Sequence, residues 1–381
     1  MRTRTTVEDP RRDWTVGCLR SRAFDGVFLF GCAALSLASG FGAWYRPEWL
    51  IPILAFDILV LSSQHVIATY SRLYFDRLSF RRHRFLTLIA PWIALLWVVG
   101  LFMLGGTTLV TTLYLYVQWF HYVGQGYSVE RQYAFRVPGV RPQFDLLSAA
   151  AVTAIPLFGI LHRSLQKRLN PDEVYLTFNF TPLPVTHAVV SASGVLAIVI
   201  CGAWLFRQIE RYTEGKATVP QTLYMIIHWG IFLCGYYLID DITCGWLVFT
   251  VWHNSQYLLM VWLYNNNRFQ DRVDPRARWL SYLSRRKTFA LWMVVCLVLS
   301  GVFYKVVSVL DGWLVKALVS HQDLFSMNPE FFRSSGLLRL NLVPDSTALA
   351  AAVAMLSYQV INVHHYMVDA VVWKVGDRVD S

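Results

Sequence analysis

Charged residues are scarce in this sequence: Asp, Glu, Lys and Arg make up 15% of the 381 residues, whereas 55% are hydrophobic. Soluble globular domains usually carry about 25% charged residues. The composition therefore excludes an ordinary soluble enzyme of this size, and it predicts an all-α, polytopic membrane helix bundle.

Cysteine is also scarce. None of the six cysteines belongs to a Cys-x-x-Cys pair, so the sequence indicates neither a disulfide framework nor a zinc ribbon. The net charge of +10 comes from Arg and Lys in short runs between apolar segments, where anionic lipid headgroups would meet them. We therefore expect the membrane, and not nucleic acid, as the partner of these charges.

Apolar runs long enough to cross a bilayer predict about ten transmembrane helices. No long linker or low-complexity tract separates them, so residues 24–373 are expected to form a single transmembrane helical domain. Residues 1–23 and 374–381 are expected to be cytosolic tails. The predicted spans are 24–44, 50–71, 86–104, 107–127, 145–161, 187–206, 221–239, 243–264, 289–310 and 346–373.

The basic residues fall mainly in alternate connections. Arginines cluster at 2–22, 72–84, 131–141 and 268–287, while connections such as Gly105-Gly106 are short and poor in Lys and Arg. By the positive-inside rule, this alternation places both termini in the cytosol. We expect a multi-pass integral protein of the cell inner membrane.

Six histidines on five of the predicted spans lie at a similar predicted depth in the inner half of the membrane. Ionisable side chains inside a membrane are costly, face the bundle interior and usually mark function. For any single histidine, a hydrogen bond to a neighbouring helix remains an alternative. The histidines are His65, His121, His228, His253, His364 and His365.

Each of these histidines has polar neighbours at helical spacing. His121 shares a stripe with Gln118, Gln125 and Ser128; His253 with Thr250, Gln256 and Tyr257; His65 with Asp57, Gln64 and Thr69; and His365 with Asn362, Tyr366 and Asp369. We expect Gln125, Gln256, Tyr366 and Asp369 to orient the imidazoles or to take part directly in catalysis.

A metal ion accounts best for converging imidazoles, because neutral histidine is the commonest protein ligand for zinc, copper, iron and nickel. All six histidines are candidate ligands. His365 is favoured over its neighbour His364, because it shares a helix face with Asp369 while His364 points about 100° away. Several histidines with a carboxylate and open positions suit non-haem iron, which activates dioxygen. Haem with two axial histidines is the competing cofactor.

The motifs SSQHVIATY, WFHYVGQGY, VWHNSQY and NVHHYMVD place histidines singly on several spans. In this respect the chain resembles the Brp/Blh membrane family, whose members cleave β-carotene with non-haem iron held by histidines from different helices. The resemblance implies His65, His121, His253 and His365 as ligands. The HxxxH and HxxHH boxes of the membrane desaturases and hydroxylases are absent.

The sequence thus predicts a membrane-embedded, metal-dependent oxygenase or related oxidoreductase that acts on a lipid-soluble substrate such as a carotenoid or lipid. It identifies no electron donor. Three alternatives stay open: a membrane acyltransferase with a catalytic histidine, for which the WHNSQY stretch is the candidate, a b-type cytochrome, and a proton- or cation-coupled transporter.

Overall fold

The computed structural model describes residues 17–137, 144–171, 180–320 and 346–372, and no strand occurs within these ranges. The all-α prediction is confirmed for them. Most of the predicted N-terminal tail and the whole predicted tail 374–381 lie outside the described residues.

In chain order the elements are α1 (Arg22–Gly26), η2 (Val27–Gly31), α2 (Cys32–Tyr45), η3 (Pro47–Trp49), α3 (Leu50–Phe56), η4 (Asp57–Ser62), α4 (Ser63–Tyr74), α5 (Arg77–Arg82), η5 (Phe85–Ile89), α6 (Ala90–Ala134), α7 (Leu146–Leu169), α8 (His187–Thr213), α9 (Val219–Leu233), η6 (Cys234–Leu238), α10 (Ile242–Phe269), η7 (Pro275–Ala277), α11 (Arg278–Leu283), η8 (Arg286–Thr288), α12 (Phe289–Ser320) and α14 (Ser346–Val372).

Six helical stretches in the described part of the chain are long and apolar enough to cross a membrane. They are Arg22–Tyr45, Pro47–Tyr74, Phe85–Ala134, Leu146–Leu169, His187–Thr213 and Arg286–Lys316. The predicted spans 221–239, 243–264 and 346–373 coincide with α9 and η6, with α10 and with α14. The number of crossings and the side on which the termini lie stay predictions.

The helix α6 is interrupted where the sequence predicts a connection between two spans. Gly105 has φ −151° and ψ 19°, and Gly106 has φ 63° and ψ −159°, so neither residue is helical. The positive φ of Gly106 lies in a region that side-chain-bearing residues rarely adopt. The pair of glycines therefore allows the two parts of α6 to diverge at this point.

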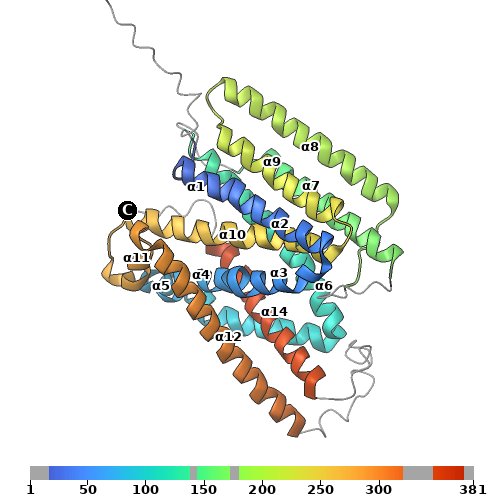
Figure 1. Ribbon diagram of the computed structural model, residues 1–381, viewed down its shortest axis with the longest axis vertical. Helices are drawn as coiled ribbons and strands as arrows, with labels where there is room; N and C mark the ends of the chain where they lie inside the picture. The colour runs from blue at the N-terminus through green and yellow to red at the C-terminus, as the bar shows by residue number, and fades with distance from the viewer. Residues whose placement is uncertain (1–16, 138–143, 172–179, 321–345, 373–381) are drawn as a thin grey trace, which may run out of the picture.

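The helix α10 lies at the centre of the bundle. Nearly all of its side chains are buried, and it packs against α2, α4, α9, η4 and η6. Figure 1 shows α8 and α12 at opposite edges of the molecule with α10 between them. The peripheral helices expose apolar side chains such as Ile198 on α8 and Val298 on α12, as lipid-facing helices do. Polar side chains on α10 must consequently find partners inside the bundle.

A local signal explains where the site-bearing helix α10 begins, and a π-helical segment precedes the site-bearing helix α4. The carboxylate of Asp241 accepts a hydrogen bond from the amide of Cys244 at 2.7 Å and caps the start of α10. The π-helical segment η4 immediately precedes α4. Such wide turns often occur at functional sites, and this one lies one turn before His65.

Candidate metal centre

Four of the predicted histidines converge from four different helices. His65 comes from α4, His121 from α6, His253 from α10 and His365 from α14. The Nε2 atoms of His65 and His365 are 3.1 Å apart, and those of His121 and His253 are 3.3 Å apart. The rings are almost entirely removed from solvent, so these four side chains form one buried cluster.

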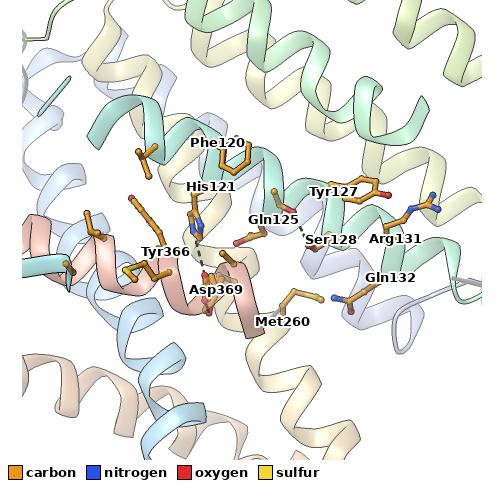
Figure 2. A pocket seen from close by; sticks show the side chains of 18 of the residues that line it. Phe120, His121, Gln125, Tyr127, Ser128, Arg131, Gln132, Met260, Tyr366 and Asp369 are labelled. Atoms are coloured by element: carbon orange, nitrogen blue, oxygen red, sulfur yellow. Dashed lines mark hydrogen bonds and ion pairs between the residues drawn. The ribbon is translucent and has the colours of Figure 1, made fainter. Parts of the chain in front are cut away.

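Asp369 brings a carboxylate to the same cluster. Its Oδ2 lies 3.3 Å from Nε2 of His365, one turn earlier on α14, and 3.7 Å from Nε2 of His121. Two overlapping groups therefore have donor atoms within 4.8 Å of one another: His65, His253 and His365, and His121, His365 and Asp369. Figure 2 shows His121 and Asp369 pointing toward each other from α6 and α14.

The spacing of the donor atoms fits shared ligation of metal. Two nitrogens that each lie about 2.1 Å from one ion are about 3.0 Å apart at a right angle and about 3.4 Å apart at the tetrahedral angle. Both Nε2 separations, 3.1 and 3.3 Å, fall within this interval. Burying four imidazoles and a carboxylate in an apolar bundle costs desolvation energy, and ligation would offset that cost.

A chain of hydroxyl groups joins His365 to Asp369. The Tyr257 hydroxyl donates to Oδ1 of Asp369 at 2.6 Å. It also lies 2.5 Å from Oγ1 of Thr69, and this atom lies 3.0 Å from Nδ1 of His365. Because the Tyr257 proton goes to Asp369 and a threonine hydroxyl has one proton, these contacts are satisfied when Thr69 donates to Tyr257 and accepts from His365. The other acceptor near Thr69 Oγ1, the backbone carbonyl of His65, is farther away at 3.2 Å.

This direction of donation assigns the tautomer of His365. Its proton is on Nδ1, which leaves the lone pair of Nε2 facing His65 and Asp369. A metal-ligating histidine typically donates its other ring N–H to a fixed partner in this way. Thr69 and Tyr257 share helical stripes with His65 and His253 in the sequence, yet that spacing gives no indication of their link to His365 and Asp369.

Tyr366 and Gln125 line a cavity that begins at this cluster. The Tyr366 ring packs on the His121 ring with centroids 4.3 Å apart. The cavity has a volume of about 850 Å³, and Figure 2 shows it extending along α6 past Gln125 and Ser128 toward Gln132. Its walls are mainly apolar, with Trp97, Phe120, Val363, Met260 and Met367 among the lining residues.

A network of charged groups lies at the far end of the cavity. The Arg131 guanidinium donates to both oxygens of Glu130, at 2.6 and 2.7 Å, and lies 3.6 Å from Oδ2 of Asp145. Burial alone would raise the pKa of Asp145, but hydrogen bonds from Arg207 and from the Ser148 amide, with nearby Arg charges, lower it overall. The carboxylates therefore balance the arginine charges next to the cavity.

Three predicted site residues lie outside the cluster that the four histidines form with Asp369. Nε2 of His228 is 3.1 Å from the carbonyl of Val152, and Gln256 donates to the carbonyl of Phe28 at 3.2 Å. These contacts join neighbouring helices.

His364 is the third of these residues. Both of its ring nitrogens contact groups outside the cluster. Nδ1 lies 3.0 Å from the Tyr70 hydroxyl, and Nε2 lies 2.8 Å from the carbonyl of Leu86. A carbonyl beside Nε2 requires a proton there, so this nitrogen has no lone pair for a metal. His364 thus points away from the cluster, toward Tyr70 of α4 and Leu86 of η5, as the angle between adjacent positions on one helix predicts.

Comparison of the chain with protein-family models, with curated proteins and with solved structures found no match.

Proposed function

We propose that this chain is a membrane-embedded, metal-dependent oxygenase that uses non-haem iron and acts on a lipid-soluble substrate. In this proposal the chain crosses the cell inner membrane ten times, with both termini in the cytosol. The single observation that supports it most is the convergence of four imidazoles and one carboxylate beside an apolar cavity.

The donor set favours iron. His65, His121, His253 and His365 offer nitrogen, and Asp369 offers oxygen. Among the described residues no cysteine sulfur joins either group, which argues against the sites preferred by softer metals. Non-haem iron, when bound to histidines and a carboxylate with positions left open, supplies dioxygen activation.

The residues around the donors have separable tasks. Thr69 and Tyr257 hold His365 and Asp369 in the orientation in which both face the cluster. Tyr366 packs on the His121 ring and lines the cavity beside it. The apolar cavity walls exclude water and admit a lipid-soluble molecule next to His121 and Asp369.

The geometry supports the alternative functions less well. A haem needs a flat slot between its axial ligands, whereas the His65 and His365 rings are in contact at 4.6 Å and the His121 and His253 rings at 4.8 Å between centroids. An acyltransferase needs one histidine base that faces the substrate, and would leave the other three rings without a role. A transporter would use the cluster as a relay without retaining stoichiometric metal.

Metal analysis of purified protein tests the proposal. We expect one or two equivalents of iron per chain, no Soret band, and loss of the iron in the double variant His253→Ala, His365→Ala. The matched control is His228→Ala, which removes a buried membrane histidine outside the cluster and should keep its iron. Metal-free protein that retains activity would refute the proposed function, and a Soret band would favour the cytochrome.

A further inference from the structure

We infer that the cavity beside His121 and Asp369 binds an elongated apolar molecule that carries a neutral hydroxyl group, and that this hydroxyl donates a hydrogen bond to Gln125. The inference deepens the proposed function by naming the class of substrate, and it rests on that function for the reaction itself. The binding step can be measured without metal.

The first argument concerns Oε1 of Gln125, a hydrogen-bond acceptor that has no partner among the described residues. Gln125 lines the cavity, and its Oε1 is buried with no hydrogen-bond partner among the described residues. The side-chain Nε2 points to the backbone carbonyl of His253 at 3.4 Å. Because a carbonyl can only accept, the amide nitrogen must face it, and the oxygen is left for a donor from a ligand.

The second argument concerns charge. Among the described residues that line the cavity, the cationic side chain is Arg131, and Glu130 holds it by two hydrogen bonds. Ser148 and Asp145 also lie beside it. A carboxylate ligand would have to compete with these acceptors, and would place a second negative charge near Asp369. A neutral polar group is therefore preferred to an acid.

The third argument concerns shape. The lining residues on the second part of α6 run from Val117 to Gln132, a distance of about 22 Å at 1.5 Å per residue. Apolar side chains from the first part of α6 and from α14 also line this space. A long narrow apolar chain fills this space better than a compact polar molecule does. Gln125 lies one helical turn from His121, so a bound hydroxyl is held close to the cluster.

Matched probes test the inference on chelator-treated protein in detergent micelles. The probes are a pyrene-labelled long-chain alcohol, the carboxylic acid of equal length and the corresponding hydrocarbon, and binding is followed by energy transfer from tryptophan to pyrene at pH 8. We expect the alcohol to bind most tightly. Gln125→Leu should weaken alcohol binding about 3- to 10-fold, the effect of one lost hydrogen bond, and leave the hydrocarbon unchanged.

A glycine allows the cavity to be filled without a clash. A Cβ added at Gly124, which lines the cavity, meets no atom within 4 Å, so Gly124→Phe should block binding of all three probes. The matched control is Gly202→Phe on α8, where an added Cβ also meets open space. If Gln125→Leu fails to fold, Gln125→Met removes the same acceptor with a side chain of similar length.

Several outcomes would overturn the inference. They are equal affinity for the acid and the alcohol, unchanged alcohol binding in either Gln125 variant, and unchanged binding in Gly124→Phe. Because the assay uses metal-free protein, absence of iron in the native protein would refute the proposed function but would not change the conclusion on alcohol binding. Selective alcohol binding in a protein without iron would identify a binding site for an apolar alcohol that has no oxygenase chemistry.

Discussion

Replacing Thr69 by valine removes the central hydroxyl of the chain that joins His365 to Asp369, while the shape of the side chain is almost kept. Thr69 is 1% exposed. Its Oγ1 lies 3.0 Å from Nδ1 of His365 and 2.5 Å from the Tyr257 hydroxyl. The change leaves the buried N–H of His365 without its acceptor and takes a donor away from the tyrosine oxygen.

The expected magnitude follows from these two losses. A buried donor left unsatisfied costs about 1–3 kcal/mol of stability, and loss of a group that orients a metal ligand costs about 10- to 100-fold in metal affinity or activity. We therefore expect Thr69→Val to lower the iron affinity by about 10- to 100-fold and to reduce stability by about 2 kcal/mol. Thr69→Ser, which keeps the hydroxyl, should restore most of the iron binding.

The matched control is Thr250→Val on α10. Thr250 is also buried, but its hydroxyl donates to the carbonyl of Trp246 on its own helix at 2.7 Å, so its loss should cost about 1 kcal/mol or less and no iron. The assay measures iron retained after graded chelator exposure, together with thermal unfolding in detergent. If Thr69→Val keeps iron as tightly as Thr250→Val, the hydroxyl chain does not position ligands and the argument fails.

Two further predictions concern the tenth predicted span and the topology. His365→Ala should eliminate iron binding and oxygen-dependent turnover of a lipid-soluble substrate, Asp369→Asn should weaken iron retention about 10- to 100-fold, and His364→Ala should mainly lower stability. Equal iron content in the three purified variants would contradict this order. Reporter fusions at residue 80 should report the cytosol and fusions at residue 106 the outside, and the opposite pattern would reverse the orientation drawn from the basic connections.

Local patterns explain what the sequence could predict. Apolar runs mark helices because each helix satisfies its own backbone groups, and the break at Gly105 and Gly106 coincides with a pair of residues that tolerate unusual backbone angles. The four converging histidines stood out for a similar reason, since an ionisable side chain is conspicuous in an apolar segment.

Predicted depth in the membrane could not separate ligand candidates from packing residues. His228 and His364 have the same residue type and predicted depth as the four clustered histidines, yet one bonds to Val152 and the other to Tyr70 and Leu86. The predicted depth gives only the position of a residue across the membrane. The direction in which a side chain points depends on which helices lie beside it, and this packing is not encoded in any one segment.

The same limitation hid the roles of Thr69 and Tyr257. Each lies four residues after a clustered histidine, His65 or His253, so sequence spacing attaches it to that histidine. In the structure both reach across to α14, where Thr69 contacts His365 and Tyr257 contacts Asp369. These contacts join residues more than 100 positions apart in the chain, and only the packing of α4, α10 and α14 creates them.

The location of the cluster explains how its donor side chains can be held rigidly while a molecule in the cavity still reaches them. His253 lies on α10, whose side chains are nearly all buried, so this donor has little freedom to move. His121 and Asp369 instead border the cavity between α6 and α14. A molecule that enters from the cavity therefore meets one imidazole and one carboxylate, while the remaining imidazoles stay behind them. This asymmetry is what an open-sided metal site requires: fixed ligands on one side and a substrate chamber on the other.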